Sequence, residues 1–265
     1  MNNRDLQAHT KAHYDDFPFD FLTAEDERNI EALQPAPFLR FADAYLKPGT
    51  KAAEVGCGPG RGTLFMMQRG VDLLAIDIST GSLRLARRRA PDCRFVQATN
   101  LQLPLPPGCF DAVVSDGVIH HTPNAHRSFS ENARILKPGG MMYVGVYRRR
   151  RYYYYLYTYF GRPVRWLEKR IWGKALIYAT LLPLYYAAHL VKSRGKRTWR
   201  GAKNFFYDYI ITPQATFHTR EEIESWGREN GLELVEYDEN VGNVHAFVFC
   251  KPFEEARDEK ISQQD

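Results

Sequence analysis

The chain has 265 residues, of which 44% are hydrophobic and 14% aromatic, and its formal net charge is +5. This length and composition suffice for one sizeable core and do not require two independent domains, so one domain with a large insertion is the simplest prediction. The four cysteines are scattered, without a CxxC pair or a Cys/His cluster, so the sequence suggests neither a metal site nor a disulfide framework, and the default location is a reducing cytoplasm.

Residues 1–36 mix polar and aromatic side chains and are predicted to form an N-terminal lid segment. The first 16 residues contain no apolar h-region and no small-residue cleavage site, so a secretory signal is not expected. The stretch from Tyr14 to Phe19 holds two Asp and one Pro, which argues against a long helix there. A helix is expected at 37–46, where apolar residues recur at helical spacing before Lys47-Pro48-Gly49.

Short apolar strands then alternate with helices. Strands are predicted at 51–55, 72–77, 94–97, 110–115 and 141–147, with helices at 63–69, 82–90 and 124–136. The alternation stops after Tyr147 and resumes with a helix at 219–230 and two closing antiparallel strands at 232–237 and 245–251. Alternation of this kind predicts an α/β fold with a mostly parallel sheet and helices on both faces, because parallel strands need crossover connections.

The predicted organisation is therefore a sheet domain formed by 37–147 and 219–253, interrupted by a helical cap at 148–218 and followed by a charged tail at 254–265 that is expected to be disordered. Between Arg148 and Lys203 there are 15 Lys and Arg but only one acidic residue, Glu168, so this segment carries about +14 and the remainder about −9. The longest apolar run, 175–191, is at the short edge of what crosses a bilayer, which predicts a buried or interfacial helix.

Several functions are compatible with this basic, aromatic insertion. It can cap the binding site of a small anionic or lipid-like molecule, with the apolar helix lining a tunnel. It can contact a membrane surface, because amphipathic, Arg-rich segments bind anionic lipids. It can bind nucleic acid, although no RNA-binding module is visible in the sequence. It can also form a structural or oligomeric contact with the acidic body of the protein.

A glycine-rich turn follows the first predicted strand. Its spacing, Gly56-x-Gly58-x-Gly60, differs from the GxGxxG of dinucleotide-binding folds and from a phosphate loop. Glycines at such a turn let the backbone approach a ligand closely and direct unpaired N–H groups towards it. The next strand ends on Asp77, and an acidic residue at that position can accept both hydroxyls of a ribose.

Four stretches, in this order, resemble the class I S-adenosylmethionine (SAM)-dependent methyltransferases, and in particular the type 11-like group that includes small-molecule O- and C-methyltransferases. They are AEVGCGPG at 53–60, AIDIS at 75–79, FDAVVS at 110–115 and RILKPGG at 134–140. The resemblance covers roughly 40–147 and 219–251. It implies a Rossmann-like seven-stranded sheet, an α-helical cap inserted after the fifth strand, and SAM as the cofactor.

By this resemblance, the glycine turn and Glu54 hold the methionine moiety of SAM, Asp77 binds the ribose and Ile78 lies against the adenine. Many members carry an Asp after the third strand, where this chain has Thr99. Either Thr99 or Asn100 is expected to accept the hydrogen bond from the adenine amino group in its place. The alternative is that backbone and packing alone hold the adenine. The full set implied for the cofactor is Tyr14, Glu54, Gly56, Cys57, Gly58, Gly60, Asp77, Ile78, Thr99, Asn100, Leu101, Ser115, Asp116 and Val118.

Methyl transfer to a hydroxyl or a carbon acid needs a base near the strand ends. His120 and His121 are the candidates, because some members of the class carry a base at a similar pair; the alternative is that a histidine here caps the next helix. Candidate substrate-binding residues lie in the insertion and where it rejoins the sheet. They are Tyr152, Tyr155, Asp208 and His218.

The expected function is transfer of a methyl group from SAM to oxygen or carbon of a small metabolite, hydrophobic or phosphate-bearing, in the biosynthesis of small molecules. The chain lacks an NPPY or DPPY motif after the fourth strand and a Pro-Cys loop, which argues against adenine-N6, glutamine and cytosine-C5 methylation. The alternatives are an RNA methyltransferase, or a membrane-surface or RNA-binding protein that retained the SAM fold. The expected location is cytoplasmic, with peripheral membrane contact and oligomer formation left open.

Overall fold

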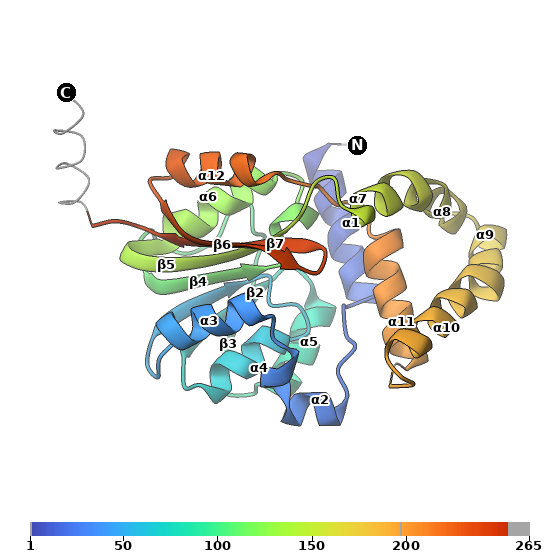
Figure 1. Cartoon of the computed structure of the whole chain (residues 1–265), viewed down its shortest axis with the longest axis horizontal. Coiled ribbons are helices and arrows are strands. Elements are labelled where there is room, and N and C mark those ends of the chain that lie inside the picture. The colour runs from blue at the N-terminus through green and yellow to red at the C-terminus, as the bar shows by residue number, and fades with distance from the viewer. Residues whose placement is uncertain (1, 197, 254–265) are drawn as a thin grey trace.

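The computed structural model describes residues 2–196 and 198–253 (Figure 1). At its centre is a seven-stranded sheet in the order β3-β2-β1-β4-β5-β7-β6. β1 to β5 pair in parallel, and β7 pairs antiparallel with both β5 and β6. The strands are β1 Lys51–Val55, β2 Asp72–Asp77, β3 Arg94–Gln97, β4 Phe110–Asp116, β5 Leu136–Tyr147, β6 Glu233–Val241 and β7 Val244–Cys250.

Helices cover both faces of this sheet (Figure 1). On one face lie α3 (Ala36–Tyr45), α4 (Arg61–Gln68) and α5 (Thr80–Arg89), where Phe38, Phe65 and Leu83 share a core with Ala112 and Tyr143 of the sheet. On the other face lie α6 (Ala125–Ile135) and α12 (Arg220–Glu229), which pack against the alternate side chains of the same strands. The predicted α/β fold with helices on both faces is confirmed.

The N-terminal segment differs from the prediction. Residues Asn3–Asp16 form a long helix, α1, where the Asp and Pro content argued against one. A capping box between Asn2 and Asp5 begins it, and it ends just before Pro18, so the proline terminates the helix rather than preventing it. Two short helical turns follow, α2 Ala24–Arg28 and η1 Ile30–Leu33.

Contacts with distant parts of the chain explain why α1 tolerates acidic residues in its last turn. The Asp15 carboxylate accepts hydrogen bonds from the Ser79 hydroxyl at 2.8 Å and from the Gly81 amide at 3.1 Å. The Phe17 ring stacks on Tyr207 of the insertion, with 3.8 Å between ring centroids. The helix therefore lies between the sheet domain and the insertion, beside α11 in Figure 1.

The insertion after β5 is an α-helical cap, as predicted. It is made of α7 Tyr152–Tyr155, η3 Leu156–Phe160, α8 Gly161–Glu168, α9 Ile171–Leu176, η4 Ile177–Leu181, α10 Leu182–Lys192, α11 Trp199–Phe206 and η5 Tyr207–Ile211. The segments η3, η4 and η5 are π-helical turns, which are frequent at functional sites. The cap has a small core of its own, in which Val164, Ile177 and Leu182 pack with Phe206 and Ile210.

The long apolar helix of the cap is largely exposed. Residues Ile171–Lys192 are long and apolar enough to cross a membrane, yet only 11% of their apolar window is buried within the described structure. The run 175–191 was expected to be either buried or interfacial. The first of these alternatives, a buried helix, is therefore wrong. One face of the helix packs through Ile177 and Leu182, and the other face lacks a partner among the described residues.

Candidate functional site

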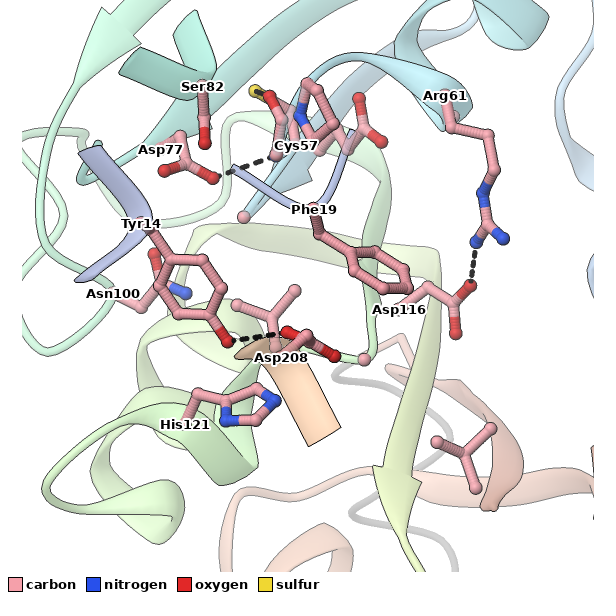
Figure 2. Close-up of a pocket in the computed structure, with 18 of the residues that line it drawn as sticks. Tyr14, Phe19, Cys57, Arg61, Asp77, Ser82, Asn100, Asp116, His121 and Asp208 are labelled. Carbon is pink, nitrogen blue, oxygen red and sulfur yellow. Dashed lines mark hydrogen bonds and ion pairs between the residues drawn. The ribbon is translucent and has the colours of Figure 1, made fainter. Parts of the chain in front are cut away.

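The glycine turn lies at the carboxyl end of β1, where the chain leaves the sheet to begin α4. Gly56 has φ +86°, and a Cβ on it would lie 2.2 Å from a methyl group of Val118, so only glycine fits this close approach. The Gly58 amide donates to Asp77 Oδ2 at 2.8 Å, which joins the turn to the end of β2 (Figure 2). The turn after β1 and the end of β2, joined by two residues 19 apart in sequence, thus form one wall of a cavity.

Asp77 is a half-buried carboxylate that only backbone groups satisfy among the described contacts. Besides Gly58, the Ser79 amide donates to its Oδ1 at 2.8 Å. Burial raises the pKa of Asp77, and the backbone donors oppose that rise. Each carboxylate oxygen accepts one of these bonds and has a further lone pair available for a ligand hydroxyl.

Glu54 is the second acid of this wall, and it is buried. Its carboxylate accepts a hydrogen bond from the Thr63 hydroxyl at the start of α4. Burial raises its pKa to about 8, so it is mostly protonated at neutral pH in the absence of a cationic partner. Asp116, at the end of β4, pairs with Arg61 at 3.0 Å across the cavity (Figure 2).

The loop after β3 supplies the position at which this chain has Thr99. The Thr99 hydroxyl accepts from the Leu101 amide at 3.2 Å and from the Gln7 side chain of α1. Asn100 is buried and lines the cavity. Because Thr99 is already engaged by two donors, the geometry favours Asn100 as the side chain of this loop that is free to reach a ligand base.

The far part of the cavity is aromatic and closed by the lid and the cap. The whole cavity measures about 350 Å³. Here the Tyr14 hydroxyl of α1 donates to Asp208 Oδ1 of η5 at 3.1 Å, and His121 lies beside this pair (Figure 2). Apolar and aromatic side chains complete this part of the lining, namely Phe19, Phe21, Leu22, Phe38, Tyr147 and Tyr209.

Asp208 is poised between protonation states at neutral pH. Burial raises its pKa to about 7, and the hydrogen bond from Tyr14 opposes the rise. Burial and the neighbouring Asp208 raise the pKa of Tyr14 well above its ordinary value, so Tyr14 remains a neutral donor. An acid with a pKa near 7 in an apolar pocket is suited to accept a proton from a bound molecule.

The two histidines differ in position. His121 lines the cavity, and its Nδ1 lies 2.7 Å from the Gln214 carbonyl, so Nδ1 carries the proton and Nε2 is an acceptor. Burial lowers the pKa of His121 to about 4, and it is neutral at physiological pH. His120 lies outside the cavity lining; its Nδ1 accepts from the Tyr147 amide at 3.2 Å, and its ring packs on Tyr147.

Five other predicted site residues also lie outside the cavity lining. Gly60 packs against Ala86 of α5, and the Ser115 hydroxyl donates to a backbone carbonyl of β1. Tyr152 and Tyr155 are 65% and 51% exposed on the cap. His218 lies in a separate shallow groove and pairs with Glu222 at 2.9 Å. The remaining predicted residues line the cavity, including Cys57, Ile78 and Asp208.

The structure adds lining residues that the sequence did not indicate. Arg61 directly follows the glycine turn, so its place next to this motif could have indicated that it lines the cavity. Further lining residues come from the lid, from η5 of the cap and from the β6–β7 hairpin, where no local motif marks them; among them are Gln7, Thr10, Phe19, Phe21, Tyr209, Val241 and Asn243. Within 2–196 and 198–253, no group of three or more His, Cys, Asp or Glu side chains is arranged to hold a metal ion.

Comparison with known proteins identifies this arrangement. Residues 53–144 match the family model described as a methyltransferase domain. Over about 100 residues the chain is 32% identical to a demethylmenaquinone methyltransferase of Beutenbergia cavernae, covering 38% of this chain and 42% of that protein. It is 36% identical to a probable tRNA methyltransferase 9B of Mus musculus, covering 38% of this chain and 22% of that protein. The chain thus spans less than half the length of these relatives.

The solved structures agree with the fold. A Burkholderia thailandensis 1,6-didemethyltoxoflavin-N1-methyltransferase, with S-adenosylhomocysteine (SAH) bound, aligns at a TM-score of 0.56 with 15% identity, covering 96% of this chain and 92% of that one. Residues 53–144 are a methyltransferase domain, and the structure has the fold of the class I SAM-dependent methyltransferases. The cofactor of this class is SAM.

The cavity fits SAM on three counts. Asp77 presents a half-buried carboxylate without an ion pair among the described residues, which suits the two ribose hydroxyls. The turn at Gly56 has no room for a side chain. Glu54 is a buried acid that a cation would ionise, which suits the charged methionine end of SAM. When bound, SAM supplies an electrophilic methyl group on a positively charged sulfur.

Binding of SAM is expected to release a proton from Glu54. The pKa of Glu54 is about 8 in the free protein, so close to one proton leaves per SAM bound at pH 7, and affinity rises with pH up to about pH 8. Calorimetry in two buffers of different ionisation enthalpy measures this release. The Glu54→Gln variant should show no buffer dependence; identical heats for the wild type in both buffers would contradict the assignment.

Proposed function

We propose that this methyltransferase moves the methyl group of SAM to oxygen, or to an acidic carbon, of a small and largely apolar molecule. The observation that carries the proposal is the hydrogen bond between the half-buried Tyr14 and the buried Asp208, in an aromatic pocket that is continuous with the cofactor site. Asp208 has a pKa of about 7 there, which matches the requirement for a general base at neutral pH.

In this mechanism the acceptor lies against the aromatic lining, with its hydroxyl or C–H directed at Asp208. Asp208 takes the proton, the oxygen or carbon of the acceptor forms a bond to the methyl carbon, and the carbon–sulfur bond breaks in line. The positive charge of the sulfonium is lost in the step, so the products are neutral SAH and the methylated acceptor beside a protonated Asp208. Tyr14 holds the carboxyl in place through its hydroxyl, and His121 supplies a neutral acceptor beside it.

The name of one relative supports a small molecule as the acceptor. The protein that is 32% identical over about 100 residues is named for demethylmenaquinone, a small organic acceptor. The lining of this chain's pocket, with Phe19, Phe21 and Tyr209, suits an apolar ring more than a phosphate group.

RNA is the second candidate acceptor. A tRNA methyltransferase 9B is 36% identical over 104 residues, and the cap carries about +14. Arg and Lys with exposed aromatic rings can hold a single-stranded nucleic acid.

The test measures SAH formation with a panel of phenols, quinols and small carboxylic acids, and separately with total tRNA, and identifies the product by mass spectrometry. We expect turnover on a ring-bearing small acceptor and none on tRNA. Turnover on tRNA that falls steeply with salt would replace this proposal by the second candidate. Failure to bind SAH in calorimetry would reject both.

A further inference from the structure

The outer helix of the cap presents an apolar face that the described protein leaves uncovered. It consists of α9, η4 and α10, residues Ile171–Lys192, which form the side of the cap away from the sheet (Figure 1). Ile171 is 92%, Leu184 68% and Val191 82% exposed. No charged residue occurs between Lys174 and Lys192. We call this surface the outer face.

Basic and aromatic side chains border the outer face at both ends. At its beginning, the Arg170 guanidinium lies 3.5 Å from the Trp166 ring centroid, and Trp172 packs edge-on against Trp166. At its end, Lys192 and Lys196 are exposed and Trp199 follows. Tryptophan and basic residues that flank an apolar stretch are the composition of membrane-interface segments.

We propose that the outer face docks the protein on a membrane surface that contains anionic lipid, with the helix lying in the interface. The apolar side chains enter the boundary between headgroups and acyl chains, and the bordering cations contact lipid phosphates. The outer face lies within residues 148–203, which contain fifteen Lys and Arg against one acidic residue, and this charge favours a negative surface over a neutral one.

Two observations favour a helix that lies on the membrane over one that crosses it. The charge-free stretch is 17 residues, which is at the lower limit of the roughly 17–25 that span the hydrocarbon core. The inner face of the same helix is held by the cap, because Ile177 and Leu182 are buried against Phe206 and Ile210. A helix that crossed the bilayer would have to separate from the cap and break that core.

A second copy of the chain is the competing occupant. The charge distribution disfavours it, because residues 148–203 carry about +14 in each copy, and two caps brought together would repel each other. Docking is also independent of the proposed chemistry, since none of the outer-face residues named here lines the cavity.

Vesicle co-sedimentation of the full chain tests the proposal, with phosphatidylcholine alone and with about 30 mol% phosphatidylglycerol. We expect binding to the anionic vesicles at least about tenfold tighter than to the neutral ones, and weaker binding at higher salt. The double variant Leu184→Glu/Val191→Glu should bind at least about thirtyfold more weakly, because it places charge in the apolar contact. Lys192→Gln/Lys196→Gln should weaken only the anionic binding, by about tenfold, and flatten its salt dependence.

Val235→Glu is the matched control. Val235 is 52% exposed on β6 of the sheet domain, and its replacement should leave vesicle binding unchanged. Circular dichroism and SAH affinity should be the same in every variant, because the changes are on the surface. Absence of wild-type binding, or equal binding by the Leu184→Glu/Val191→Glu variant, would overturn the proposal. So would binding that only detergent reverses, or a dimer in sedimentation velocity that this double variant dissociates.

Discussion

Replacing Asp208 by Asn should lower the rate of methyl transfer by about 10² to 10⁴, the range that general bases contribute. Asn has nearly the same shape and keeps an oxygen that can accept from Tyr14, so the pocket is preserved while the base is lost. For the wild type at saturating SAM, kcat/KM for the acceptor should rise with pH and level off above about pH 7, because only the ionised Asp208 accepts a proton. The variant should lack this rise.

Tyr14→Phe is the companion variant for Asp208. The Tyr14 hydroxyl lowers the pKa of Asp208, so its removal should move the midpoint of the pH profile upward while the plateau rate changes less than in Asp208→Asn. SAH affinity is measured alongside, because Tyr14 also lines the cofactor cavity. A loss below tenfold in Asp208→Asn, or a midpoint that stays in place in Tyr14→Phe, would contradict the assignment of Asp208 as base.

Asp208→Asn should also change the stability of the protein, and this effect can be measured without an acceptor. The pKa of Asp208 is about 7 in the folded protein and about 3.8 unfolded, so the unfolded state loses its proton first as pH rises. Wild-type stability therefore falls between about pH 4 and pH 7, by up to about 4 kcal/mol from this group. Asn cannot ionise, so urea unfolding should show Asp208→Asn more stable than wild type at pH 7.5, with the difference vanishing near pH 4.

Asp77→Ala should weaken SAH binding about a hundredfold. Two hydrogen bonds from ribose hydroxyls to a charged acceptor are each worth about 1.5 kcal/mol or more, and both are lost. Asp77→Asn keeps one acceptor oxygen and should lose about tenfold. Calorimetry with SAH measures both, and thermal melts verify that the variants fold.

The control for Asp77 lies on the same strand. Asp72 begins β2, is half exposed and pairs with Arg94 on β3, far from the strand ends that line the cavity. Asp72→Ala should bind SAH as the wild type does. An affinity for SAH that is unchanged in Asp77→Ala would remove Asp77 from the site and leave the cavity's ligand open.

Much of this fold could be predicted from local patterns. The strands at 51–55, 72–77 and 94–97 coincide with β1, β2 and β3. The central strand β1 shows the reason most clearly, because it is a short run before a turn signal and is buried on both faces of the parallel sheet. The glycine turn and Asp77 were recognisable for a similar reason. Each occupies a strand end, and parallel strands bring such ends to one edge of the sheet.

The lid could not be predicted in the same way. The acidic residues and Pro18 reduce helix propensity locally, whereas the bonds from Ser79 and Gly81 to Asp15 form only after the sheet domain is folded. Tertiary contacts of this kind override propensity, which is worth a few tenths of a kcal/mol per residue. Lid side chains such as Phe19 entered the cavity lining without any motif to mark them.

The sequence by itself determined the cofactor half of this protein, because glycine conformation and a strand-end acid are local properties that a short motif records. Only the tertiary structure decided the other half. It joined Tyr14 to Asp208 across 194 residues, placed His121 in the cavity and His120 behind it, and left Tyr152 and Tyr155 on the surface. The physical reason is that the burial of a side chain depends on which distant segments pack together. Burial raises the pKa of Asp208, and its absence leaves the outer face exposed.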